Sequence, residues 1–114
     1  MLDRMIRMAL LLDFYGALLT PKQRLSAELY YHQDMSLAEI ARYLNISRQA
    51  VHDLIHRAQA LLEDYERRLG LIEQSQSRRE AINRILVLLE DLEENHPGAA
   101  DDLAEIRRLV SEHF

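Results

Sequence analysis

Two histidines, His52 and His56, lie four residues apart, a spacing that places both imidazoles on one face of a helix. With Asp53 they form the segment His52-Asp53-Leu54-Ile55-His56, which superficially resembles the His-Glu-x-x-His zinc signature. The Asp is shorter than the Glu of that signature, and the sequence offers no evident third ligand. We therefore do not predict a zinc site, and we expect neither a metal nor a cofactor.

Acidic side chains gather near the end of the helix expected at 72–95, as Glu90-Asp91 and Glu93-Glu94. Paired carboxylates can serve as a general acid and a general base. Such a run is more often a solvated helix face, and its place near the negative end of the helix dipole hints at a basic partner. The sequence contains no Cys, no Gly-rich phosphate loop and no Ser/His/Asp arrangement. We predict no catalytic residues and no enzyme.

A third group of polar residues suits the reading of DNA. A helix that enters the major groove contacts base edges with its N-terminal residues. Arg48 would pair with guanine and Gln49 with adenine, although Asp53 also lies on the outward face. The alternatives are a solvated face, or a motif that binds protein or RNA. The predicted nucleic-acid-binding residues are Ser47, Arg48, Gln49, His52, His56 and Arg57, with Lys22, Arg24 and Arg42 as phosphate contacts.

These side chains would be positioned by a helix-turn-helix within residues 36–57. Two closely crossing helices need a small residue, which Ala41 supplies, and a turn residue that tolerates positive φ, which Asn45 supplies. Ser36 begins a capping box, and Ser47 caps the second helix, which would read the major groove with residues 47–57. The apolar residues expected between the helices are Ile40, Leu44, Ile46, Val51 and Leu54.

The rest of the chain is also predicted to be helical, which gives an all-α fold. Helices are expected near 1–17, 21–32, 37–44, 47–69 and 72–95, and a last helix is marked by Leu103, Ile106 and Val110. Asn95-His96-Pro97-Gly98 breaks the chain between the last two. We expect residues 1–70 to form a helix-turn-helix domain with a long recognition helix. Residues 71–114 would form a helical hairpin that packs on it as one structural unit.

The long helix at 47–69 carries a heptad seam whose second half has no partner within the helix-turn-helix. It must pack on the C-terminal region or on another chain. We expect both, with the hairpin covering part and a homodimer covering the rest. The predicted dimer seam is Leu61, Leu62, Tyr65 and Leu69.

Charge is distributed unevenly over the 114 residues. The formal net charge is −5, and residues 1–69 hold nine Arg/Lys and nine Asp/Glu, so the whole excess of acid lies in residues 70–114. A domain that binds nucleic acid by its bulk charge would be basic. The N-terminal apolar run from Met8 to Leu12 is too short for a signal-peptide core or a membrane span, so we expect a cytoplasmic protein.

Three segments, Leu18-Leu19-Thr20-Pro21-Lys22-Gln23-Arg24, Ser36-Leu37-Ala38-Glu39-Ile40-Ala41 and Ser47-Arg48-Gln49-Ala50-Val51, together resemble sigma factor region 4. A second set of segments is Asp13-Phe14-Tyr15, Leu18-Leu19-Thr20, Lys22-Gln23, Leu29-Tyr30-Tyr31, Ser47-Arg48-Gln49-Ala50-Val51, Arg57-Ala58 and Leu61-Leu62-Glu63-Asp64-Tyr65-Glu66. This set resembles, more narrowly, the YlxM/p13 family of small bacterial proteins. The resemblance covers roughly residues 10–95 and is specific in its N-terminal half. Asn45 replaces the usual turn glycine.

The resemblance implies a sigma region 4-like module without the rest of a sigma factor. Members of this family are encoded beside signal recognition particle genes, which implies a regulatory or accessory role in that pathway, with its components as partners. The motif itself favours a DNA-binding transcriptional regulator, with DNA as the partner. A protein-binding adaptor that uses the motif as a scaffold is the third interpretation.

Overall fold

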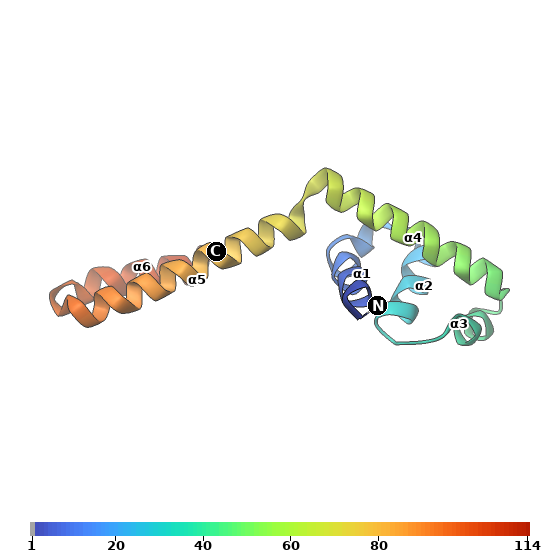
Figure 1. Ribbon diagram of the computed structural model, residues 1–114, viewed down its shortest axis with the longest axis horizontal. Coiled ribbons are helices and arrows are strands. Elements are labelled where there is room, and N and C mark those ends of the chain that lie inside the picture. The colour runs from blue at the N-terminus through green and yellow to red at the C-terminus, as the bar shows by residue number, and fades with distance from the viewer. Residues whose placement is uncertain (1) are drawn as a thin grey trace. The chain divides into compact units, whose positions relative to one another are not determined.

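The computed structural model describes residues 2–114 as an all-α fold, in which the described residues form no strand (Figure 1). This confirms the predicted fold class. Met1, which we included in the first helix, lies outside the described residues. The α-helices are α1 (Leu2–Tyr15), α2 (Pro21–Tyr31), α3 (Leu37–Leu44), α4 (Arg48–Leu69), α5 (Leu71–Asn95) and α6 (Ala100–His113), and short 3-10 helices cover Gly16–Leu18 and Pro97–Ala99.

Helix starts and ends are set by the local signals that the sequence displays. Thr20 and Ser36 each form a capping box, with Gln23 and Glu39 respectively. Both boxes satisfy amides that have no partner within the helix. Asn45 adopts the left-handed conformation at φ 55°, as predicted, and ends α3. The first helix ends before the predicted residue 17, because the chain tightens into a 3-10 turn after Tyr15.

The chain divides into two compact units, Met1–Ile72 and Glu73–Phe114. In the first unit, α4 packs against α1, α2 and α3. None of the helices in the described part of the chain is long and apolar enough to cross a membrane. That the hairpin packs on the first unit stays a prediction.

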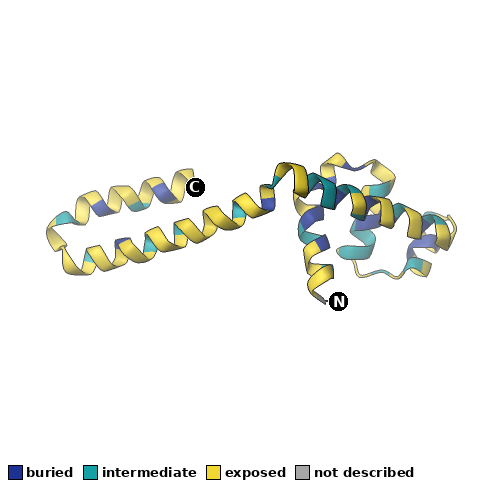
Figure 2. Cartoon of the chain, turned by 45° about the horizontal axis from the view of Figure 1, so that its top comes forward, coloured by how far each residue is buried: buried dark blue, intermediate teal, exposed yellow. Residues whose placement is uncertain are grey.

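Two apolar clusters hold the first unit together (Figure 2). The smaller cluster lies at the crossing of α3 and α4 and consists of Ile40, Ala41, Val51 and Ile55. The larger one joins α1 and α2 to the second half of α4 and consists of Met8, Leu11, Leu12, Tyr15, Leu19, Ala27, Ala58, Leu62 and Ile72.

The larger cluster corrects one sequence-based interpretation. We expected the second half of the α4 seam to pack on the C-terminal region or on another chain, yet Leu62 is fully buried within the first unit and Leu61 and Tyr65 pack beside it. Helix α1 supplies the missing partner. The spacing of α1 showed an apolar face but not which helix that face would cover. Leu69 alone of the four remains exposed, and the homodimer itself stays a prediction.

The second unit is a hairpin of two helices with a small interior. Leu89 on α5 and Leu103 and Val110 on α6 are its buried hydrophobic residues among those described. Beside them, Arg107 donates to Glu93 across the hairpin at 3.0 Å. This ion pair is half exposed, so it contributes little to the free energy of unfolding.

Candidate nucleic-acid interface

The helix-turn-helix is closed by backbone hydrogen bonds at its turn. The Asn45 amide donates to the carbonyls of Ala41 and Arg42, and the Ile46 amide donates to Ala41 at 3.1 Å. These bonds satisfy carbonyls that α3 leaves free at its end. Ala41 is 8% exposed at the helix crossing, where a larger side chain would have to displace its neighbours. The turn therefore fixes the first residues of α4 relative to α3.

The first turns of α4 present three of the predicted contact residues together. Arg48, Gln49 and His52 are exposed and, with Leu37 from the start of α3, line a shallow surface pocket. Because a helix N-terminus carries a partial positive charge, this end of α4 favours an anionic ligand. The pocket is the place where the predicted base-reading side chains converge.

Ser47 and Gln49 already have partners within the protein. The Ser47 hydroxyl accepts from the Ala50 amide at 3.0 Å, so it acts as the helix cap. The Gln49 side-chain amide donates to Asp53 at 3.0 Å along the exposed face of α4. Before it can read an adenine, Gln49 has to give up that contact.

The two histidines lie one turn apart on the same exposed face. Their ring centroids are 4.2 Å apart, and His52 Nδ1 lies 3.6 Å from an Asp53 carboxylate oxygen. Among residues 2–114, no group of three or more His, Cys, Asp or Glu side chains is arranged to hold a metal ion. The pair belongs to the outward face of α4, beside Gln49.

The predicted phosphate contacts come from three helices. Lys22 lies exposed on the first turn of α2, Arg42 on α3 and Arg57 on α4. Arg24 is engaged by Glu28 at 2.9 Å on the surface of α2. Arg48 and Arg57 form no ion pair within the described part of the chain, so both charges are available to a ligand.

Sequence reasoning missed one exposed aromatic residue next to this surface. Tyr43, on the last turn of α3, is 69% exposed, more than any other large hydrophobic residue whose exposure is described in the first unit. It lies two residues before the turn residue Asn45, at the edge of the helix-turn-helix. The available signal was a large aromatic residue off the apolar stripe of Ile40 and Leu44, which predicts exposure.

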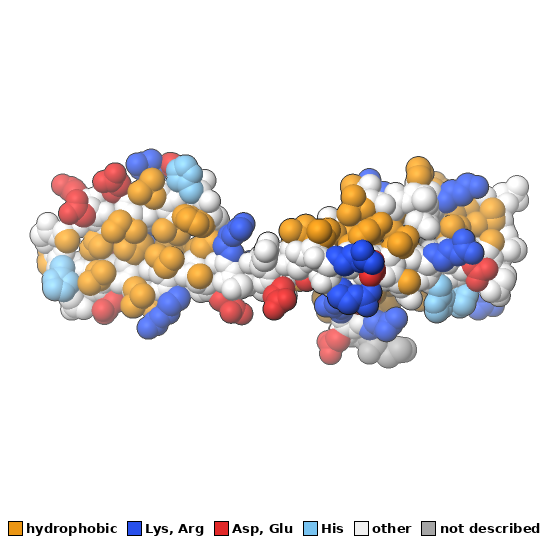
Figure 3. Space-filling model, turned by 90° about the horizontal axis from the view of Figure 1, so that it is seen from above, with side chains coloured by type: hydrophobic (Ala, Val, Ile, Leu, Met, Phe, Trp, Pro, Cys, Tyr) orange, Lys and Arg blue, Asp and Glu red, His pale blue; other side chains and the backbone are white. Residues whose placement is uncertain are grey.

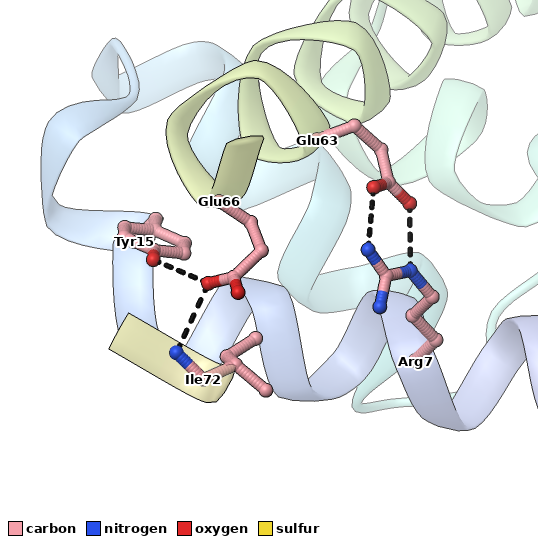
Figure 4. Close-up of polar contacts among 5 residues, drawn as sticks. All are labelled: Arg7, Tyr15, Glu63, Glu66 and Ile72. Carbon is pink, nitrogen blue, oxygen red and sulfur yellow. Dashed lines mark hydrogen bonds and ion pairs between the residues drawn. The ribbon is translucent and has the colours of Figure 1, made fainter. Parts of the chain in front are cut away.

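The second half of α4 is tied to α1 by polar contacts (Figure 4). Arg7 donates two hydrogen bonds to the Glu63 carboxylate, at 2.9 and 2.7 Å. These bonds hold the pKa of the Glu63 carboxyl below its usual range, while partial burial opposes the shift. The interaction is a bidentate one, the strongest geometry available to an arginine and a carboxylate.

A second polar group joins the end of α4 to α1 and to the first residues of α5. The Tyr15 hydroxyl donates to Glu66 at 2.6 Å and accepts from the Leu71 amide at 3.0 Å. Glu66 also accepts from the Ile72 amide at 3.0 Å (Figure 4). Burial raises the pKa of the Tyr15 phenol, and the bond to Glu66 raises it further. Two of the free amides at the start of α5 are satisfied in this way.

Comparison with known proteins finds a family whose model matches most of this chain. The family model described as "Putative helix-turn-helix protein, YlxM / p13 like" (UPF0122) matches residues 2–100. A UPF0122 protein from Geobacillus kaustophilus is 47% identical over 112 residues, which is 98% of each chain. Another from Symbiobacterium thermophilum is 47% identical over 105 residues, covering 92% of this chain and 90% of the relative.

Proposed function

Because the chain belongs to the YlxM/p13-like helix-turn-helix family, we propose that it binds duplex DNA with the first turns of α4 in the major groove. The observation that supports this most is the convergence of Arg48, Gln49 and His52 on one shallow pocket directly after the turn. All three are exposed, and the helix beneath them is held by a well-packed crossing with α3. A rigid helix that presents polar side chains at its N-terminus is the geometry of a major-groove reader.

Each side chain has a defined task in this arrangement. Arg48, which has no acidic partner among residues 2–114, is suited to the two acceptors of a guanine edge. Gln49 would exchange Asp53 for the donor and acceptor of an adenine, and the released Asp53 would accept from a cytosine amino group. Arg48 therefore carries most of the expected discrimination, because it breaks no internal contact on binding.

The cations around the pocket supply the contacts that do not depend on sequence. Arg42, Arg57 and Lys22 would neutralise phosphates on either side of the groove. Arg24 can join them, because its exposed pair with Glu28 is weak in water. Since residues 1–69 carry equal numbers of acids and bases, we expect the affinity to depend on these few contacts and to fall steeply with added salt.

DNA duplexes that bind the wild-type protein are first selected from a randomised pool. The affinity of each variant for these duplexes is then measured by fluorescence anisotropy. Arg48→Ala should weaken binding by at least about tenfold, the effect of losing one bidentate base contact. The matched control is Arg68→Ala, which removes another exposed arginine near the other end of α4 and should leave binding unchanged. Undetectable binding at low salt, or equal losses in the two variants, would contradict the proposal.

A regulatory or accessory role in the signal recognition particle pathway, which the resemblance implies, is the second proposal. The family match over residues 2–100 supports the resemblance from which this role is inferred. The test adds the protein to the particle's RNA and to its GTPase, and measures binding and the rate of GTP hydrolysis. If neither component is bound and the rate is unchanged, this role is excluded, and a protein-binding adaptor becomes the remaining interpretation.

A further inference from the structure

The hairpin of the second unit exposes an apolar stripe on each of its helices. On α5 the stripe runs through Ala81, Ile85, Leu88 and Leu92, which step by four, three and four residues. Ile85, Leu88 and Leu92 are 38–47% exposed, as are Ile106 and Leu109 on α6. The spacing on α5 is that of a coiled-coil seam, yet these side chains are not the ones that α5 turns toward α6.

Both stripes lie on the same side of the hairpin. Each exposed residue directly precedes one that faces the other helix: Ile85 precedes Leu86, Leu88 precedes Leu89, and Leu109 precedes Val110. A step of one residue is a rotation of about 100° around a helix. Because α5 and α6 are antiparallel, stepping back one residue from a position that faces the other helix leads to the same side of the hairpin on both helices. Figure 3 shows hydrophobic side chains gathered over both helices on the face turned to the viewer. We call this surface the hairpin face.

The hairpin face is large compared with the interior of the unit. Three hydrophobic side chains are buried between α5 and α6 in the described structure, whereas five large ones lie half exposed on the face. Two helices form a single layer, and a single layer with an apolar side is stable only against a second layer.

Charges at the ends of the hairpin face indicate what the second layer is. Residues 87–105, around the connection, contain seven Asp/Glu and no Arg/Lys. Helical spacing places Asp102 and Glu105 beside the face at this end, and Arg78 beside it at the other end. A second copy turned end for end would bring Arg78 of each chain to the acids of the other. A parallel copy would instead bring acid to acid.

We propose that two copies of the chain associate through their hairpin faces, antiparallel and related by a two-fold axis, so that α5 of each copy lies against the hairpin face of the other. The same surface is used on both copies, so the contact closes on itself and yields a dimer rather than a fibre. Ile85 of one copy then packs near Leu88 of the other at the two-fold axis, and Ala81 lies opposite Leu92.

The test is analytical ultracentrifugation of the full chain from micromolar to millimolar concentration. Leu88→Lys places a charge at the centre of the face and should raise the dissociation constant of the dimer by at least about thirtyfold. Val87→Lys is the matched control. Val87 is the adjacent residue, is 55% exposed and lies off the stripe, so this variant should associate like the wild type. Far-UV circular dichroism of each variant checks that the helices are retained.

Three results would overturn the proposal. The first is a wild-type chain that is monomeric throughout the concentration range. The second is equal association of the Leu88→Lys and Val87→Lys variants. The third is a dimer that Leu69→Lys dissociates while Leu88→Lys leaves it intact, because Leu69 belongs to the seam predicted on α4 and not to the hairpin face.

The orientation is tested separately, by disulfide cross-linking. The chain contains no cysteine, so a single introduced thiol reports on one position without interference. In a mixture of Ala81→Cys and Leu92→Cys chains, oxidation should yield the mixed disulfide as the main dimer. Predominant joining of Ala81→Cys chains to each other would show a parallel arrangement and overturn the antiparallel one.

Discussion

The two halves of α4 are one continuous helix with opposite surroundings. The N-terminal half, around Arg48 and His52, buries only a narrow stripe against α3 and leaves its charged residues in solvent. The C-terminal half buries Ala58 and Leu62 against α1 and α2, and its acids Glu63 and Glu66 are paired with groups of α1.

This difference shows how one helix can both hold a fold and present a binding surface. Apolar contacts and paired acids stabilise the C-terminal half, so substitutions there should change the free energy of unfolding. The N-terminal half owes its position to the same helix but contributes few contacts of its own. Substitutions on its outward face should change binding and leave stability nearly unaltered.

The largest effect is expected from Leu62→Ala in the C-terminal half. The side chain is fully buried, and its loss leaves a cavity between α4 and α1. The free energy of unfolding should fall by about 2–5 kcal/mol. Urea denaturation followed by circular dichroism measures it, with His56→Ala as the exposed control, expected within about 0.5 kcal/mol of the wild type. Equal stability of the two variants would remove the contrast between the halves.

Ala41→Leu tests the crossing that positions the N-terminal half. The added methyl and methylene groups meet a closely packed α3–α4 contact, so the free energy of unfolding should fall by about 1–3 kcal/mol. Thermal melts provide the measurement. A neutral result would count against the helix-turn-helix packing described for this pair of helices.

Tyr15→Phe removes one hydroxyl from the polar group at the end of α4. The Leu71 amide loses its acceptor and Glu66 loses a donor, while the ring remains buried. We expect a loss of about 1–2 kcal/mol. Urea denaturation should show it. A variant as stable as the wild type would mean that water replaces the hydroxyl at no cost.

Glu63→Gln should have the smallest effect, and one that depends on pH. The folded protein lowers the pKa of Glu63 from its ordinary value of 4.5, so the stabilisation is complete above that value. It is lost as the pH falls through the lower pKa of the folded state. Because both partners are about half exposed, the substitution should cost less than about 1 kcal/mol at neutral pH.

The measurement for Glu63→Gln is the melting temperature from neutral pH down to pH 3. The difference in melting temperature between the variant and the wild type should shrink toward the acid end of that range. A difference that stays constant with pH would show that the ion pair with Arg7 is not its source. Asp64→Asn serves as the control, since the pKa of Asp64 is also lowered, but by arginines of α4 itself.

Much of the first unit was predictable because its signals are local. The capping box at Ser36 and the left-handed Asn45 depend on neighbours within a few residues, and each was found where predicted. The contacts between α1 and α4 were not foreseen. Arg7 and Glu63 are charged residues of common types, and nothing in their spacing distinguishes a paired acid from a solvated one.

For the candidate site, too, local features were predictable from the sequence and contacts between helices were not. That Arg48, Gln49 and His52 point outward follows from helical periodicity once the buried stripe is known. The hydrogen bond from Gln49 to Asp53 is compatible with their spacing of four, but rotamer choice decides it. Leu37 joins the pocket through the crossing of two helices, which the sequence indicates without giving its angle.

The long sequence separation of the contacts between α1 and α4 bears on the order in which the chain folds as it is synthesised. The cluster of Ile40 and Ile55 can form as soon as the first half of α4 has left the ribosome. The hydrogen bonds of Arg7 and Tyr15 span 56 and 51 residues, so α1 must wait for Glu63 and Glu66. We therefore expect the helix-turn-helix to assemble before the larger cluster that joins α4 to α1.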